Sequence, residues 1–356
     1  MAATLHALSE LSDEQRSAWD AIVRGSVTLD SPYFTRGYCE AVDAAKGGVE
    51  VVAVSEGGRT AALLPFERDG RAGHPVGRLL NDYQAVIAAE DAAYEPAEML
   101  AAAGLRALHF DHLLASQAAL ADYHERADCS PYLCVAGGEA AYLETVGKSG
   151  RGLYRTARRK ARKMGREVGP LSLTLNDPDP AALESLFEWK GRQYADTGLP
   201  NVLEAGWTRD LFERLLSGED PACRGVLTTL RAGGRLAAVH MGMTSGGVYH
   251  WWFPTYCEGL SAYSPGMALL TGLVERAEEF GVEKIDLGKG MADYKRRLMS
   301  GGVPLAEAVV QRPGLMRSAR RAAASAKAWL RRTPLRPALS APARWVYHLR
   351  TRRALR

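Results

Sequence analysis

Apolar residues recur along the chain with two different periods, which predict a protein that mixes helices and strands. Spacings of three and four residues predict helices over 11–24, 95–103, 138–147, 178–197 and 206–217. Short apolar runs between Gly-rich and Ser-rich turns predict strands at 51–54, 61–65, 107–114, 171–175, 225–231, 235–244 and 248–253. Both halves of the chain mix hairpins with helices, which favours a duplicated fold.

The order of elements is clearest from Val226 to Gln311, where the pattern reads β-β-β-α-β-α-β. Three strands lead into a long helix that we expect to run from Tyr263-Ser264-Pro265-Gly266 to about Phe280, where Gly281 ends it. A strand at 284–287, a short helix near 291–299 and a strand at 303–310 follow.

The start of that long helix is the first candidate binding feature. Pro265 suits the first helical position, and Gly266 lets a ligand approach the backbone closely. The free N–H groups at a helix start favour a phosphate. Since Ser-Pro-Gly opens many helices, a plain capped helix is the alternative interpretation.

A second charged feature covers residues 148–166, which hold nine Lys and Arg and no acid. On a helix these cations lie mostly on one face, and Leu153, Ala157, Ala161 and Met164 lie on another. Such a helix fits the phosphates of a ligand, an anionic acceptor or lipid headgroups, and it equally fits a solvated linker.

Charge is distributed unevenly along the 356 residues, although 45 Lys and Arg against 41 Asp and Glu leave a net charge of only +4. Residues 312–356 carry 13 of the basic residues and no acid, so residues 1–311 have a net charge of −9. The tail combines basic residues with Trp329, Trp345 and Leu349, which favours a helix lying on an anionic membrane. A disordered basic tail is the alternative, and binding to nucleic acid is not expected.

Several functional classes lack their sequence signals. Neither a P-loop motif nor a hydrolase nucleophile motif is present, and the five cysteines and eight histidines show no metal-ligand spacing. We expect no metal, no signal peptide and no spanning helix. A cytoplasmic protein, peripheral on the inner face of the membrane, is the resulting expectation.

A set of short segments carries a family resemblance over about residues 10–311. The sequence resembles the CelD-like branch of the GNAT acyltransferases, related to the FemAB-type tandem-GNAT proteins, and the resemblance extends to bacterial ceramide synthases. The segments are Asn81-Asp82-Tyr83-Gln84, Phe110-Asp111-His112-Leu113, 158–163, 189–194, His240 with its neighbours, His250-Trp251-Trp252-Phe253-Pro254, Tyr263-Ser264-Pro265-Gly266, Ile285-Asp286-Leu287-Gly288 and Tyr294-Lys295.

The resemblance implies an α+β fold of two GNAT-like domains, 1–147 and 148–311, followed by the tail 312–356. It also implies that acyl-CoA is bound by the second domain. The residues that would cradle it are Tyr263, Ser264, Gly266, Met267 and Ala268. The usual Q/R-x-x-G-x-G/A signature is only partly kept there, and related proteins use aminoacyl-tRNA as the donor.

Acyl transfer to an amine requires a base, and transfer from a thioester also benefits from an acid for the leaving thiolate. His240 lies in an apolar strand and is our candidate base, with Asp286 as a weaker candidate; a core histidine is the alternative. The resemblance makes Tyr294 the candidate acid, with a core tyrosine as the alternative. The substrate-binding candidates are Asp82, Tyr83, His112, Trp189, Lys190, Tyr194, His250, Trp251, Trp252 and Lys295.

The sequence therefore predicts an acyl-CoA-dependent N-acyltransferase. The aromatic run at 250–254 is either core packing or a wall for a long acyl chain. With the basic tail it favours a long-chain lipid amine such as a sphingoid base as acceptor. The alternatives are an acyltransferase of exopolysaccharide or cellulose biosynthesis, a FemAB-like aminoacyl-tRNA-dependent transferase and a non-catalytic membrane scaffold.

Overall fold

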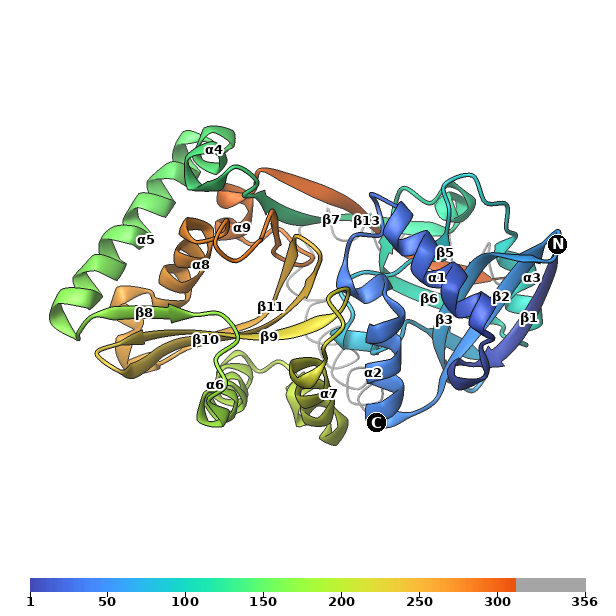
Figure 1. Cartoon of the computed structure of the whole chain (residues 1–356), viewed down its shortest axis with the longest axis horizontal. Coiled ribbons are helices and arrows are strands. Elements are labelled where there is room, and N and C mark those ends of the chain that lie inside the picture. Colours follow the sequence, from blue (N-terminus) through green and yellow to red (C-terminus); the bar gives the residue numbers. More distant parts are fainter. Residues whose placement is uncertain (312–356) are drawn as a thin grey trace, which may run out of the picture.

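The computed structural model describes residues 1–311, so the predicted tail at 312–356 lies outside the described residues. A large mixed sheet runs through both halves of the described chain, and helices cover its faces (Figure 1). This is the α+β class that the sequence predicts.

The first half contains three helices and seven strands. Helix α1 starts at a capping box, in which the Ser12 side chain accepts the Gln15 N–H and Gln15 returns a bond to the Ser12 N–H. Its elements are β1 (Ala2–Ala7), α1 (Asp13–Gly25), α2 (Arg36–Lys46), β2 (Val49–Glu56), β3 (Arg59–Asp69), β4 (Ala72–His74), β5 (Ile87–Ala88), α3 (Pro96–Ala102), β6 (Ala107–Leu114) and β7 (His124–Cys134).

The second half follows the predicted order of elements. They are α4 (Gly138–Thr145), α5 (Lys148–Glu167), β8 (Leu171–Thr174), α6 (Pro180–Thr197), α7 (Gly206–Ser217), β9 (Arg224–Ala232), β10 (Arg235–Ser245), β11 (Val248–Tyr256), α8 (Pro265–Glu275), β12 (Lys284–Asp286), α9 (Asp293–Leu298) and β13 (Gly301–Gln311). Short 3₁₀ helices lie at Leu8–Glu10, Pro32–Phe34, Arg78–Leu80, Ala118–Tyr123, Val202–Glu204 and Glu258–Tyr263.

One predicted element is too long. The helix expected to reach Phe280 ends at Glu275, because Arg276 leaves the helical conformation with φ −108° and ψ 14°. A series of turns then leads to Gly281, whose φ of +65° is the left-handed conformation that glycine adopts most readily.

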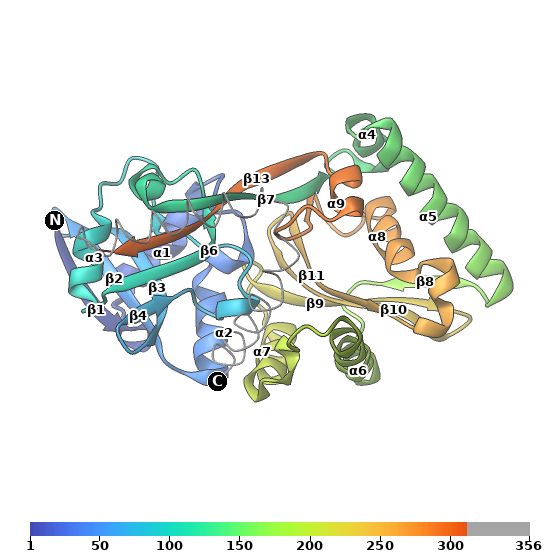
Figure 2. The same cartoon turned by 180° about the vertical axis from the view of Figure 1, so that it is seen from behind.

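The order of strands joins the two halves into one sheet: β1-β2-β3-β4-β6-β13-β7-β12-β11-β10-β9-β8. The last strand, β13, returns to the first half and pairs antiparallel with both β6 and β7. Strand β7 in turn pairs with β12 of the second half. The long strands β7 and β13 therefore bridge the two halves, as Figure 2 shows.

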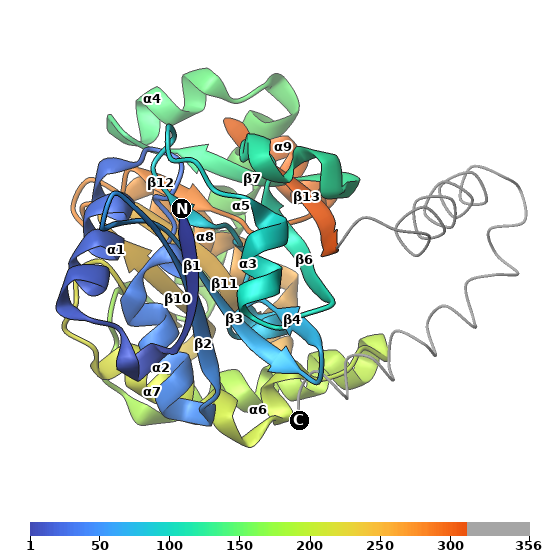
Figure 3. The ribbon, with the colours of Figure 1, turned by 90° about the vertical axis from the view of Figure 1, so that its right-hand side faces the viewer.

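Three apolar clusters form the core. In the first half, α1 and α2 pack on the sheet face carrying Val51 and Ala53, while α3 packs on the opposite face with Val52 and Val54 (Figure 3). The third cluster lies beneath α4, α5 and α8. The first cluster also includes residues of α6, α7 and β10, so it extends across the junction between the halves.

Candidate functional site

The sheet opens beside β11, in the middle of the second half. Strands β11 and β12 pair in parallel only from Val248 with Lys284 to His250 with Asp286. Strand β11 continues to Tyr256, whereas β12 ends at Asp286. The part of β11 beyond His250 therefore has no strand partner on this side within the described chain.

A cavity of about 390 Å³ lies against this part of β11. It brings together Lys190, Trp251, Ser264, Gly266, Met267 and Tyr294, all of which the sequence predicts as site residues. Six further residues complete its wall: Gln193, Pro254, Thr255, Tyr256, Ser261 and Leu270. Of these, only Gln193 and Pro254 lie in segments that carry the family resemblance.

The start of α8 forms one side of the cavity. Ser264 precedes the helix in the left-handed conformation, at φ 54° and ψ 59°. Its hydroxyl lies 2.9 Å from Lys160 Nζ, which brings a positive charge from α5 to this helix start. Tyr263 hydrogen-bonds outward to Glu167, and Ala268 is buried within the helix. The N–H groups, the helix dipole and Lys160 all favour an anion here.

Two ionisable side chains reach the cavity. Burial lowers the pKa of Lys190 to about 8, and its Nζ donates a hydrogen bond to Gln193 Oε1 at 2.9 Å. Burial raises the pKa of Tyr294 to about 12, so its hydroxyl stays protonated at neutral pH. A protonated phenol lining a cavity can donate a proton to a leaving group.

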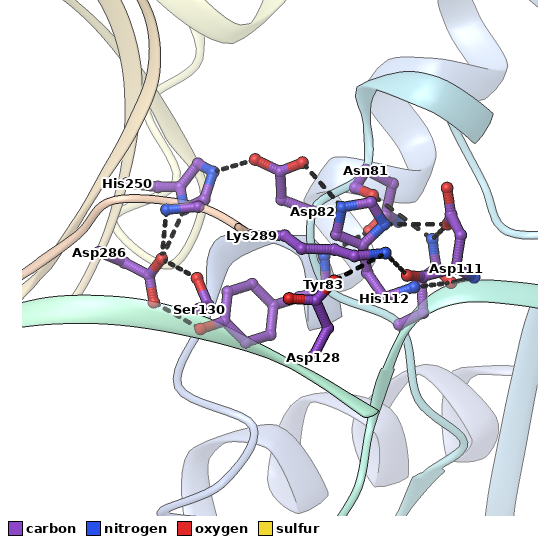
Figure 4. A network of polar contacts seen from close by, with 12 residues as sticks. Asn81, Asp82, Tyr83, Asp111, His112, Asp128, Ser130, His250, Asp286 and Lys289 are labelled. Carbon is purple, nitrogen blue, oxygen red and sulfur yellow. Dashed lines mark hydrogen bonds and ion pairs between the residues drawn. The ribbon is translucent and has the colours of Figure 1, made fainter. Parts of the chain in front are cut away.

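A second group of polar residues lies at the junction of the two halves (Figure 4). Asp82, in the loop after the 3₁₀ helix Arg78–Leu80, is bracketed by two histidines. His250 Nε2 lies 3.1 Å from one carboxylate oxygen, and His112 Nε2 lies 3.5 Å from the other. The outer ring nitrogens face two more acids, with Asp111 Oδ1 at 3.0 Å from His112 and Asp286 Oδ1 at 3.7 Å from His250.

These five residues alternate acid and histidine across the junction. His112 Nδ1 and His250 Nδ1 are buried, and neither makes a well-aligned hydrogen bond within the described chain. Burial raises the pKa of Asp82, but the His250 hydrogen bond and the charges of His112 and Lys295 outweigh it, so that pKa is lowered. Asp82 is therefore an anion at neutral pH.

Asp286 is the most strongly held member of the network. Its Oδ1 accepts hydrogen bonds from the Ser130 hydroxyl at 2.7 Å and the Gly288 N–H at 2.9 Å. Its Oδ2 accepts one from the Tyr83 hydroxyl at 2.5 Å. With 2% of the residue exposed, this carboxylate joins β7, β12 and the loop that carries Tyr83.

Two lysines lie near the network. Lys295 donates to the carbonyl oxygens of Gly288 and Lys289 at 3.0 and 3.2 Å. Its pKa is lowered, because burial outweighs the acids around it. Lys289 contacts the Asp111 carbonyl oxygen and lies 3.9 Å from the Asp128 carboxylate.

The predicted base, His240, belongs neither to the cavity lining nor to the polar network. His240 is fully buried, with Nε2 accepting the Trp252 N–H at 2.8 Å and Nδ1 at 2.7 Å from the Tyr249 hydroxyl. Burial holds its pKa well below the usual range. Both ring nitrogens are thus occupied by neighbouring groups, and Trp251 stacks on the ring at 4.0 Å.

The predicted aromatic wall is divided between two environments. Trp251 and Pro254 line the cavity, whereas Trp252 packs against Phe212 at 5.2 Å between ring centroids. Trp189 and Tyr194 are partly buried against the same core cluster as Trp252, with Tyr194 also 5.8 Å from Lys190 Nζ.

Sequence reasoning missed part of the network. Asp111 stands immediately before His112 in a segment that the resemblance includes, so the local sequence contains a signal for it. Ser130 and Asp128 lie on β7, a strand that the pattern does not predict because its first residues are polar. Among residues 1–311 no group of three or more His, Cys, Asp or Glu side chains could hold a metal ion.

Known proteins provide an independent comparison. Residues 151–296 match the family described as "Acetyltransferase (GNAT) domain". No curated protein matches the sequence significantly. Within residues 1–311, no helix is both long enough and apolar enough to span a membrane.

Solved structures resemble most of the chain at low identity. The C-terminal domain of a protein described as a lysylphosphatidylglycerol synthetase from Agrobacterium fabrum is 15% identical, with a TM-score of 0.54; the match covers 89% of this chain and 96% of that one. FemX is 10% identical, with a TM-score of 0.55 and coverage of 87% and 96%. These two likenesses show a shared fold.

The family match runs from within α5 to within α9, a range that includes the sheet opening, the cavity, Tyr294 and the second-half residues His250 and Asp286. Residues 151–296 therefore match an acetyltransferase (GNAT) domain within this α+β fold, and this match supports an acyltransferase.

Proposed function

We propose that this acyltransferase moves an acyl group from acyl-CoA to an amine, with the donor in the cavity and the amine at the Asp82–His112 pair. One observation carries the proposal. Two consecutive residues of β11 reach the cavity and the polar network: Trp251 lines the cavity, and His250 belongs to the network. The pairing of β11 with β12 stops at His250, so the opening in the sheet begins beside the network.

The cavity suits an acyl-CoA donor in charge and size. The start of α8 and Lys160 favour the pyrophosphate, and a volume of about 390 Å³ fits an extended small-molecule chain. The walls at Trp251, Met267 and Leu270 are apolar, which suits a pantetheine arm and an acyl chain.

The Asp82–His112 pair suits an ammonium group. If the Nδ1–H of a neutral His112 faces Asp111, its Nε2 presents a lone pair toward Asp82 Oδ1 at 3.5 Å. Two acceptors this close favour a donor that reaches both of them from one side, such as the ammonium form of the acceptor substrate. His112 then takes one proton, and Asp111 stabilises the charge that forms on the ring.

The neutral amine then attacks the carbonyl carbon of the thioester. A C–N bond forms, the C–S bond breaks, and the leaving thiolate takes a proton from the Tyr294 hydroxyl. The second amine proton leaves to solvent as the tetrahedral intermediate collapses, and the Tyr294 phenolate regains a proton from solvent. In this scheme the base is His112 and not His240, because the Nε2 lone pair of His240 is bound to a backbone N–H.

We extend the proposal to a long-chain lipid amine, such as a sphingoid base, as the acceptor. The apolar cavity wall and the Trp-containing basic tail support an amphiphilic substrate. A sugar amine is the nearest rival.

The test is a matrix of acyl-CoA donors of short and long chain with sphinganine and glucosamine as acceptors, followed by mass detection of the amide. Long-chain amide from sphinganine supports the lipid assignment, whereas amide from glucosamine alone rejects it. If no acyl-CoA raises the melting temperature or releases thiol with any amine, the donor assignment is wrong.

His112→Ala tests the base. We expect kcat to fall by ~10²–10⁴-fold with the donor affinity retained. His6→Ala removes a histidine from β1, outside the network, and should leave kcat unchanged. Near-normal kcat in His112→Ala would reject His112 as the base while leaving the donor assignment intact.

A further inference from the structure

Helix α5 forms the outer edge of the second half, at the end of the molecule farthest from the N-terminal half (Figure 1). It is 20 residues long and packs on the body through Tyr154, Ala157, Ala161 and Met164. Its opposite face is open to solvent along the whole length of the helix.

Four arginines lie along that open face: Arg155, Arg159, Arg162 and Arg166. Their spacings of four, three and four residues keep them in one row, which extends over ~16 Å at ~1.5 Å per residue. All four are exposed, and no acid of the described chain lies within ion-pair distance of any of them. We call them the arginine row.

Four of the five other cations of α5 are used within the fold, Lys148 at its first position being the exception. Lys160 bonds Ser264, Arg158 pairs with Glu275, and Lys163 lies 3.8 Å from Glu167. Arg151 donates to carbonyl oxygens near the end of α4. Apart from Lys148, the arginine row is therefore the part of this basic helix that the described chain leaves without a partner.

Like charges three and four residues apart on a helix repel one another, so the row weakens the helix on its own. An anionic partner would offset this repulsion between the arginines. Because the row is straight and lies on a helix at the outer edge of the molecule, it can present all four charges to a flat surface. Tyr154 is the only aromatic residue of α5 and is buried, so the helix offers no aromatic ring on which a nucleic acid base could stack.

We propose that the arginine row docks this protein on an anionic phospholipid surface. Each arginine near such a surface contributes a similar electrostatic attraction, which salt screens. The 13 basic residues of 312–356 carry the same sign of charge, so the sequence adds to the attraction from outside the described chain. The inference does not depend on the acyl-transfer reaction.

The test compares the full-length protein with the variant Arg155→Gln, Arg159→Gln, Arg162→Gln and Arg166→Gln. Glutamine keeps the helix propensity and removes only the charge. Sedimentation with vesicles of phosphatidylcholine containing phosphatidylglycerol measures binding. We expect the partition coefficient to fall on the order of 10²–10³-fold in low salt, with little binding of either protein to pure phosphatidylcholine.

A matched control removes the same charge from the other half. Arg24→Gln, Arg59→Gln, Arg71→Gln and Arg106→Gln change four exposed arginines outside α5, and this variant should bind nearly as the parent does. Circular dichroism confirms that both variants are folded.

Equal losses in the two variants would show a net-charge effect and overturn the proposal. Unchanged vesicle binding in the α5 variant would also overturn it. A loss confined to polyuridylate RNA, with vesicle binding retained, would assign the row to nucleic acid instead. Since acylation is measured separately, a vesicle-binding result of either kind leaves the donor and acceptor assignments to their own tests.

Discussion

His250 Nε2 lies 3.1 Å from Asp82 Oδ2, although 168 residues separate them and each belongs to a different half of the chain. Tyr33 packs edge-on against the His250 ring, with 5.0 Å between the ring centroids. The other ring nitrogen, His250 Nδ1, lies 3.7 Å from Asp286 Oδ1. The contact thus joins the second half to the first half at the point where the sheet opens.

We expect His240 to be a packing residue. His240→Ala removes a fully buried ring and leaves the Tyr249 hydroxyl and the Trp252 N–H without their partner. The free energy of unfolding should fall by about 2–4 kcal/mol in urea denaturation. Turnover of the remaining folded protein should stay within about tenfold of the parent. Unchanged stability with a large loss of turnover would instead restore His240 as the base.

Tyr294→Phe tests the acid. The ring and its packing remain, and only the hydroxyl that can protonate a thiolate is lost. We expect kcat to fall by ~10²-fold with thioester donors, with unchanged donor affinity by calorimetry. A donor with a more acidic thiol needs less protonation, so its rate should fall less. An equal loss with both donors would argue against the role of an acid.

Lys190 should make stability depend on pH. Its pKa of about 8 in the folded chain lies below the ~10.4 of an unfolded lysine, so below pH 8 folding buries a charge at a cost. That cost disappears as the pH rises from 8 toward 10.4, because the folded state loses its proton first. Lys190→Met should therefore raise the free energy of unfolding by about 1–3 kcal/mol at pH 7, and the gain should shrink by pH 10.

Denaturant titrations of the parent and Lys190→Met at pH 7, 8, 9 and 10 measure this difference. Lys163→Met is the control, since that lysine is exposed on α5. If the gain in the free energy of unfolding of Lys190→Met stays constant from pH 7 to pH 10, the buried charge of Lys190 is not the cause of that gain.

Asp286→Asn should destabilise the junction. Three donors point at this carboxylate, and an amide NH₂ placed there would face at least one of them. We expect a loss of about 2–4 kcal/mol in the free energy of unfolding, larger than the loss from Ser130→Ala, which removes one donor. Double-mutant analysis of the two changes should show coupling. Additive losses would contradict a shared hydrogen-bond network.

Local pattern predicted much of the fold because short-range spacing controls helices and strands. The strand 107–114 and the helix 206–217 have the predicted bounds, and α5 differs by one residue at its end. The first turn of α8 was predicted from Ser264-Pro265-Gly266, whose conformational preferences are local. Strand β7 was not predicted, because its polar start gives no apolar alternation and its pairing with β12 and β13 is long-range.

The sequence by itself determined the order of elements, the basic face of α5 and the residue types that meet at the cavity and the junction. Only the tertiary structure decided which of these side chains share a site. His240 and His250 are alike as residues on neighbouring strands, yet the sheet encloses one between Tyr249 and Trp252 and turns the other toward Asp82. The reason is physical: local spacing sets which face a side chain occupies, whereas strand pairing between distant segments sets what lies opposite that face.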